Sequence, residues 1–188
     1  MPILGITASQ ISGHLSSPGY DSIATNTVAT TAASITLSSI PSTYTHLQLR
    51  VQVKSTSSGT DWFYIRFNGV DTSSNYYGHW LYGNGSSALT SAPNPPGNTS
   101  AIVLGDTPGT AATNVFSSFV IDILNYTSTN KTKVLRSLGG YDANGTGMVA
   151  LSSGLALSTS AITSITIGGY NGAMNTNSSF ALYGIKGA

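Results

Sequence analysis

An aromatic cluster at residues 76–82 holds the side chains best suited to bind a ligand. Tyr76, Trp80 and Tyr82 would share one face of an extended strand. Tyr77 and His79 would lie on the opposite face. Flat aromatic rings with polar tips can stack on sugars, so either row could bind a glycan. The same residue types are enriched at subunit contacts. The sequence favours core packing or a subunit interface over glycan binding, and both alternatives stay open.

Two loops carry oxygen side chains at the alternating spacing of calcium-binding loops, beginning at Asp71 and at Asp142. A calcium loop needs a bidentate carboxylate at its twelfth position, which is Tyr82 when counted from Asp71. The second loop is equally short of acids. The histidines are too dispersed for zinc spacing, and the chain has no cysteine. We therefore predict Asx turns at both loops, with no metal and no cofactor.

Catalytic motifs are absent from the sequence. No G-x-S-x-G nucleophile elbow and no glycine-rich phosphate loop with its lysine occurs. A glycoside hydrolase needs two carboxylates across a cleft, and the chain has no Glu. The only plausible suppliers lie in expected turns: Asp61, Asp71, Asp106 and Asp142. We predict a protein that is not an enzyme and regard a glycan depolymerase as the least favoured alternative.

Charge is unusually scarce, with 7 Lys and Arg and 6 Asp in 188 residues, and Ser, Thr, Asn and Gly take its place. A net charge of +1 predicts no nucleic-acid partner and no anionic membrane partner. Lys131, Lys133 and Arg136 form the one basic cluster, which is typical of a solvated face or a guarded edge strand. Low charge also removes the repulsion that keeps the copies of a monomeric protein apart. It therefore indicates a subunit of a larger assembly.

Period-two alternation of apolar and polar residues predicts strands along most of the chain. The clearest is 45–54, THLQLRVQVK, followed by 62–68, WFYIRFN, with a turn at Asn68-Gly69. Other candidates are 115–124, 131–138, 162–168 and 179–186, two short pieces within 147–157, and weaker ones at 23–28 and 34–37. Residues 84–100 are expected to form a long loop. We predict an all-β, antiparallel, jelly-roll-like β-sandwich of about eight to ten strands, forming one domain at 21–188.

Residues 1–20 are expected to form an extended N-terminal arm. An apolar arm can lie across a neighbour and add main-chain hydrogen bonds to an exposed sheet edge. The alternative is that it folds back onto its own sandwich. The start of the chain lacks the basic and long apolar parts of a secretory signal, and no apolar run is long enough to span a membrane. We therefore expect a product made in the cytoplasm. The residues expected to dock the arm on a partner are Pro2, Ile3, Leu4, Ile6, Ile11 and His14.

Segments along nearly the whole chain resemble a family of small virion proteins of tailed bacteriophages. The most specific pieces are IDILNYTSTNKTK in the centre and SSFALYGIKG near the end. The opening PILGITASQISGH and the segment SITLSSIPSTYTHLQLRVQVKS are also similar. The resemblance implies a virion component with no catalytic residues to carry over.

Two roles follow from that resemblance. The first is a capsid decoration or cement protein, expected to form a homotrimer and to bind the major capsid protein or other virion proteins. The alternative is a tail or head-fibre adhesin that binds a host-surface glycan through the aromatic segment 76–82 and the loop 84–100. The direction in which the aromatic rows point should discriminate between them.

Overall fold

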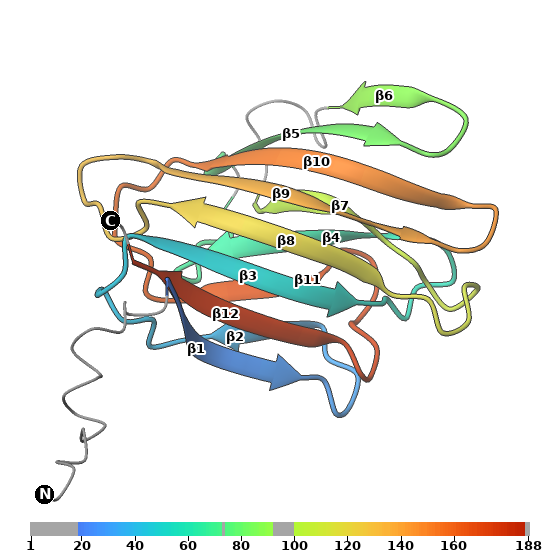
Figure 1. Cartoon of the computed structure of the whole chain (residues 1–188), viewed down its shortest axis with the longest axis horizontal. Helices are drawn as coiled ribbons and strands as arrows, with labels where there is room; N and C mark the ends of the chain where they lie inside the picture. The colour runs from blue at the N-terminus through green and yellow to red at the C-terminus, as the bar shows by residue number, and fades with distance from the viewer. Residues whose placement is uncertain (1–18, 73, 92–99, 187–188) are drawn as a thin grey trace, which may run out of the picture.

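The computed structural model describes residues 19–72, 74–91 and 100–186, and these form an all-β domain of two antiparallel sheets. Figure 1 is seen from the side of the larger sheet, with the smaller sheet behind it. No helix occurs in the described part of the chain. The predicted all-β sandwich is confirmed.

The larger sheet has eight strands in the order β1-β12-β3-β8-β9-β10-β5-β6, and the smaller has four in the order β2-β11-β4-β7. The strands of the larger sheet are β1 (Tyr20–Thr27), β3 (His46–Val53), β5 (Tyr76–Gly83), β6 (Ala88–Ser91), β8 (Ser117–Leu124), β9 (Lys133–Asp142), β10 (Gly147–Ala156) and β12 (Ser179–Ile185). Those of the smaller sheet are β2 (Ser34–Leu37), β4 (Asp61–Phe67), β7 (Ile102–Thr107) and β11 (Ile165–Gly169).

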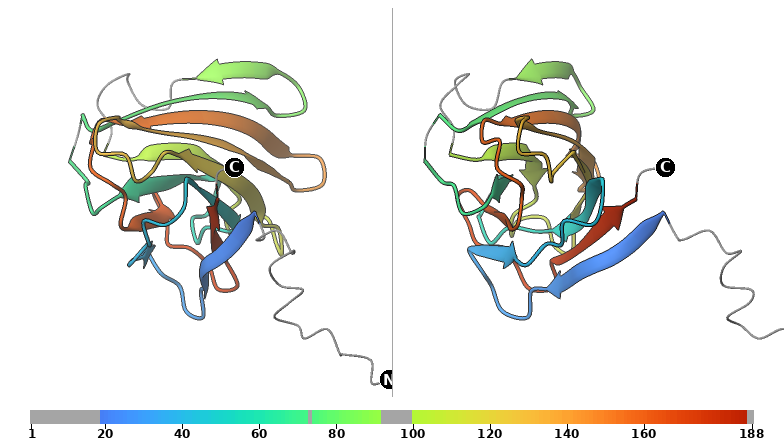
Figure 2. Two further views of the ribbon diagram at one scale, coloured as in Figure 1. Left: turned by 60° about the vertical axis from the view of Figure 1, so that its left-hand side comes forward. Right: turned by 90° about the vertical axis from the view of Figure 1, so that its left-hand side faces the viewer.

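Eight of these strands have the connectivity of a jelly roll. The chain alternates between β1-β12-β3-β8 in one sheet and β2-β11-β4-β7 in the other, so two four-stranded sheets face each other. Two pairs of strands are additional. The β5–β6 hairpin is inserted between β4 and β7, and the β9–β10 hairpin between β8 and β11. Both insertions join the same sheet and extend it beyond β8, as Figure 2 shows from two further sides.

Alternating burial in β3 explains why the sheets pack. Leu47, Leu49, Val51 and Val53 are 3% exposed or less, whereas Arg50 and Gln52 face water. Each buried aliphatic side chain of this size stabilises the fold by about 1.5–3 kcal/mol. The core between the sheets is completed by stacked rings, with Phe63 of β4 centred 5.4 Å from Phe119 of β8. A smaller apolar cluster lies under the inserted strands and contains Trp80, Val103, Met148 and Ala150.

Two strand predictions were wrong in instructive ways. Residues 147–156 form one strand rather than two pieces, because Ser152 and Gly154 fit a close contact with β7. The Ser152 hydroxyl donates to the Leu104 carbonyl at 2.6 Å, and a Cβ at Gly154 would lie 2.5 Å from Ile102. The expected loop 84–100 contains β6, and β7 follows it directly. Of the expected arm, residues 1–18 lie outside the described residues, and Tyr20 already belongs to β1.

Candidate functional site

The aromatic strand β5 divides its two rows between the core and the surface. Tyr76 is 1% exposed and Trp80 is 8% exposed, so both point into the domain and neither is open to a sugar ring. Tyr82 is half-buried and lies 5.4 Å from Trp80, ring centre to ring centre. The opposite row, Tyr77 and His79, faces outward. The structure therefore places only the second row on the surface of the large sheet.

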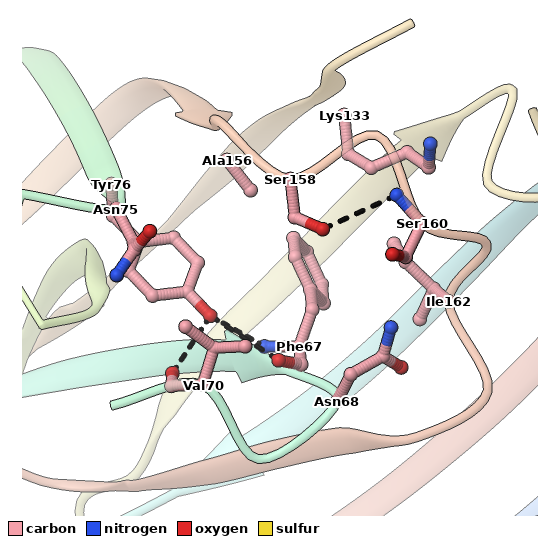
Figure 3. A pocket seen from close by; sticks show the side chains of 10 residues that line it. All are labelled: Phe67, Asn68, Val70, Asn75, Tyr76, Lys133, Ala156, Ser158, Ser160 and Ile162. Carbon is pink, nitrogen blue, oxygen red and sulfur yellow. Dashed lines mark hydrogen bonds between the residues drawn. The ribbon is translucent and has the colours of Figure 1, made fainter. Parts of the chain in front are cut away.

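The Tyr76 hydroxyl lies at a small cavity between β4 and the loop after β10 (Figure 3). It donates to the Val70 carbonyl at 2.9 Å and accepts from the Phe67 amide at 3.0 Å, while burial raises its pKa. The cavity has room for about one water molecule. The one ammonium at its wall, that of Lys133, is held by backbone carbonyls. This cavity is part of the packing of the domain, with no polar group poised for a ligand of useful size.

The most unusual surface of the molecule is the outward face of β8, β9, β10 and β5, which we call the outer patch. Seven of the eleven exposed large hydrophobic residues in the described chain belong to it, with exposures from 38% to 63%. Together they leave on the order of 600 Å² of apolar surface in water, the upper end for the largest patch of an ordinary monomer. The apolar members of the outer patch are Tyr77, Leu81, Val120, Leu124, Val134, Leu138, Val149, Leu151 and Leu155.

Strand register arranges the outer patch in rows that cross all four strands. One apolar row runs Val120, Leu138, Leu151, Leu81, because each of these residues is directly opposite the next. A second apolar row runs Leu124, Val134, Leu155, Tyr77. Between them lies one polar row, Asp122, Arg136, Ser153, His79. A shallow groove runs over the β5–β10 side of the outer patch and includes His79, Leu81, Arg136 and Leu151.

The polar row carries a single exposed ion pair. Arg136 Nε lies 3.0 Å from Asp122 Oδ2, and the Arg136 side chain is 71% exposed. Gln48 of β3 donates to the other carboxylate oxygen of Asp122 at 2.9 Å and accepts from Arg50 at 3.1 Å. An exposed pair of this kind stabilises a domain by no more than about 1 kcal/mol. The ion pair therefore contributes little to folding. Because it lies between two apolar rows, it restricts which partner surface can pack against the outer patch.

The basic cluster Lys131, Lys133 and Arg136 neither guards an edge strand nor forms one solvated face, the two alternatives expected from the sequence. β9 is an interior strand of the large sheet, and Lys133 alternates inward, where it is 1% exposed. Only Lys131 and Arg136 of the expected cluster face water. The outer face of the smaller sheet is a weaker candidate surface. There Tyr170, 45% exposed, packs edge-on against Trp62 at 5.6 Å, and Arg66 covers the Tyr64 ring at 4.5 Å.

The two suspected cation loops hold no concentrated negative charge. Asp142 accepts a hydrogen bond from the Asn144 amide at 2.8 Å, which confirms an Asx turn there. In the loop after Asp71, Asn75 donates to the Thr72 carbonyl at 3.1 Å. Among the described residues, no group of three or more His, Asp, Glu or Cys side chains could hold a metal ion.

Asp61 and Asp106 are neighbouring carboxylates, and the charge of Asp61 affects the pKa of Asp106. Asp61 is 1% exposed, and both its oxygens accept hydrogen bonds from Ser55, Asn171 and Gly172. Asp106, on β7, has an Oδ1 that is buried without a hydrogen-bond partner in the described structure. Burial first, and the neighbouring Asp61 second, raise the pKa of Asp106 to about 6. Because both oxygens of Asp61 accept local hydrogen bonds, we interpret Asp61 and Asp106 as structural residues and not as an acid–base pair.

The raised pKa of Asp106 predicts a stability change with pH. The folded state holds this proton more tightly than the unfolded state, whose pKa is near 3.8, so stability falls as pH rises from about 4 through 6. After allowance for partial exposure, the loss should be about 1–2 kcal/mol. Asp106→Asn should remove it. Urea unfolding at the two ends of this window should show the variant gaining stability over the wild type as pH rises. If the free energy of unfolding changed equally with pH in the wild type and in Asp106→Asn, Asp106 would not be the group responsible.

Comparisons with known proteins do not assign the chain to a family. No model of a protein family, no curated protein and no solved structure matches the chain. Among the described residues, no helix is long and apolar enough to cross a membrane. The expected docking residues Pro2, Ile3, Leu4, Ile6, Ile11 and His14 lie outside the described residues, so their role stays a prediction.

Most of the outer patch is not recognisable in the sequence. Leu138 and Leu151 lie in predicted strands, but the sequence does not show which face of the strand carries them, and the prediction divides 147–156 into two pieces. The outward residues Val134, Arg136 and Leu138 mix apolar and polar types, as do Val149, Leu151 and Ser153, so alternation does not mark this face in the sequence. What the sequence lacked was the pairing of β9, β10 and β5, which brings these positions onto one surface.

Proposed function

We propose that the chain is a non-enzymatic structural component of a bacteriophage virion, a capsid decoration or cement protein that is held in place by contacts with neighbouring subunits. The observation that carries this proposal is the outer patch. An apolar patch at the upper end of the range for monomers is often functional, and contiguous exposed Leu and Val side chains suit a contact with another protein. It lies on a domain with 13 formally charged residues in 188, which limits repulsion between subunits. The resemblance of several segments to small phage virion proteins supports the same role.

The buried half of the aromatic strand bears on the adhesin alternative. A glycan site built on β5 would have to use Tyr77 and His79, because Tyr76 and Trp80 lie in the core. An outward face dominated by Leu and Val offers few hydrogen-bonding groups for sugar hydroxyls. We therefore favour assembly over glycan binding at this strand.

Particle incorporation tests the proposal. Mass spectrometry of gradient-purified phage particles should find the chain in many copies per particle. Leu138→Asp should abolish incorporation, because it places a charge in the middle of an apolar row. Leu89→Asp is the matched control, since Leu89 is 41% exposed but projects from the opposite side of the sheet, beside Tyr82. Washing at high salt should leave the wild-type copy number unchanged, because few charges are available to screen.

Two results would contradict the proposed role. The first is purified particles that lack the chain altogether. The second is normal incorporation of Leu138→Asp, which would mean that the outer patch makes no essential contact in the particle. Circular dichroism of both variants must first show the wild-type β-sheet spectrum, so that a folding defect is not mistaken for a docking defect.

A further inference from the structure

The rows of the outer patch are arranged so that a second copy of the same surface can cover them. Aligned β-sheets pack face to face about 10 Å apart with their strands within about 30° of each other. Homo-oligomers most often use a twofold axis, which brings the same patch of both subunits into contact. A twofold axis parallel to the strands keeps each row at its own height. Each row would then meet its own copy in reverse order.

A twofold axis between β9 and β10 matches the rows of the two copies best. It places β9 over β10 and β8 over β5 of the second copy, which follows from the sheet order. Leu138 then faces Leu151, and Val120 faces Leu81, so one apolar row covers its own copy over four strands. The second apolar row is covered in the same way. The apolar side chains of both rows would thus be buried against the same rows of the second copy.

The polar row also matches itself about this axis. Arg136 faces Ser153, whose hydroxyl can accept from the guanidinium N–H groups that are not bonded to Asp122. Asp122 faces His79, whose ring can donate to the carboxylate. Moving the axis onto β9 would place Arg136 against Arg136. Moving it between β8 and β9 would place Leu151 against Arg50 of β3, because Arg50 continues the apolar row beyond Val120.

The area is adequate for a stable pair. The apolar side chains of the outer patch expose on the order of 600 Å², and the polar row between them brings the surface close to the roughly 800 Å² per partner of a standard interface. The formal charges in the matched rows are those of Asp122 and Arg136, which already neutralise one another at 3.0 Å. Two such faces therefore meet without net charge in the rows, so charge repulsion does not oppose their contact.

From these matches we propose that two copies of this chain pair through the outer patch, about a twofold axis that runs along the strands between β9 and β10. The proposal rests on the proposed function, because it names the partner at that surface. It also replaces the trimer expected from the sequence as the first step of assembly. Shell contacts would then be made by other parts of the dimer.

Analytical ultracentrifugation of the purified chain tests the pairing without any virus. The wild type should sediment as a dimer at micromolar concentrations. Leu138→Asp should weaken dimerisation by about 100-fold or more, as expected for a central apolar contact present in both copies. Leu89→Asp should dimerise as the wild type does. A wild type that stays monomeric, or a trimer that is unaffected by Leu138→Asp, would overturn the proposal.

Cross-linking tests the register, since the chain has no cysteine of its own. Val120→Cys and Leu81→Cys are made in separate chains and mixed. A short bismaleimide should join the two variants to each other, because Val120 of one copy faces Leu81 of the other. It should join neither variant to itself with comparable yield, because three strand spacings of about 4.8 Å separate those positions. Self-linking of Val120→Cys alone would contradict the register. Dimers in solution combined with particles that lack the chain would refute the virion role and leave the pairing intact.

Discussion

Asp61→Ala is expected to destabilise the domain by about 4 kcal/mol, because buried donors that lose their acceptor keep the full cost of desolvation. The carboxylate accepts from the Ser55 hydroxyl at 2.7 Å and from the Gly172 amide at 2.8 Å. The backbone and side chain of Asn171 also donate to it, at 2.8 and 3.1 Å. One side chain at the start of β4 therefore holds the loop after β3 and the loop after β11 together.

Urea unfolding monitored by circular dichroism measures this loss. Asp71→Ala is the matched control, since Asp71 is exposed in the turn after β4 and should cost less than about 0.5 kcal/mol. Asp61→Asn should fall between the two, because the amide keeps one acceptor oxygen while its NH2 group opposes the remaining donors. Equal stability of Asp61→Ala and Asp71→Ala would show that the loops close without the carboxylate.

Lys133→Met should cost about 3 kcal/mol, the second large effect that we expect, because hydrogen bonds to charged groups are the strongest of their kind. The ammonium donates to the carbonyls of Lys131 and Thr159 at 2.8 and 2.9 Å and also to that of Ser128. The side chain is 1% exposed, and burial lowers the pKa of its amine. Methionine fills a similar volume but leaves these carbonyls without a donor.

The free energy of unfolding at neutral pH is the readout, with Lys131→Met as the control in the same turn. Lys131 is exposed, so its replacement should change stability by less than about 0.5 kcal/mol. Because Lys133 fastens the turn before β9 to the loop after β10, its loss should also loosen the two central strands of the outer patch. If both methionine variants had the same urea midpoint of unfolding as the wild type, the hydrogen bonds from the Lys133 ammonium to the three carbonyls would not stabilise the fold.

Much of the jelly roll was readable because its clearest strands place apolar residues at every second position. β3 and β4 each bury every second residue, with Gln48 and Tyr64 buried in addition, and their predicted limits differ from the observed ones by one residue at each end. The Asn68-Gly69 turn is also confirmed, with φ of 53° and 68°, the left-handed conformation that such a two-residue turn requires. Local pattern was sufficient here because one face of each strand is core and the other is solvent.

The inserted strands β9 and β10 were harder to predict because many of their inward residues are small or polar. In β10 the inward positions include Ala150, Ser152 and Gly154, which suit a tight approach of β7 and look like a turn in the sequence. Lys133 was expected at a water-facing position and lies inside, since the carbonyls of Ser128 and Lys131 in the turn before β9 and that of Thr159 after β10 replace its hydration. Neither arrangement can be read from neighbours along the chain, because both depend on tertiary contacts.

The candidate surface was only partly predictable for the same reason. The aromatic strand β5 drew attention for its residue types, but its largest rings serve the core. The exposed face depends on plain Leu and Val residues in four strands, and their significance appears only when register sets them in rows. Exposed aliphatic residues taken singly are normal in any protein. It is their contiguity that indicates a contact.

Hydroxyl-radical footprinting is the most direct measurement of whether the outer patch is buried in the assembled state. Oxidation of Leu138 and Leu151, 57% and 50% exposed in the single chain, should be compared between purified particles and a dilute monomeric sample. We expect both side chains to be strongly protected in the particle, while Leu89, on the opposite side of the sheet, reacts alike in both. Equal oxidation of Leu138 and Leu151 in the two samples would contradict an assembly role for this face.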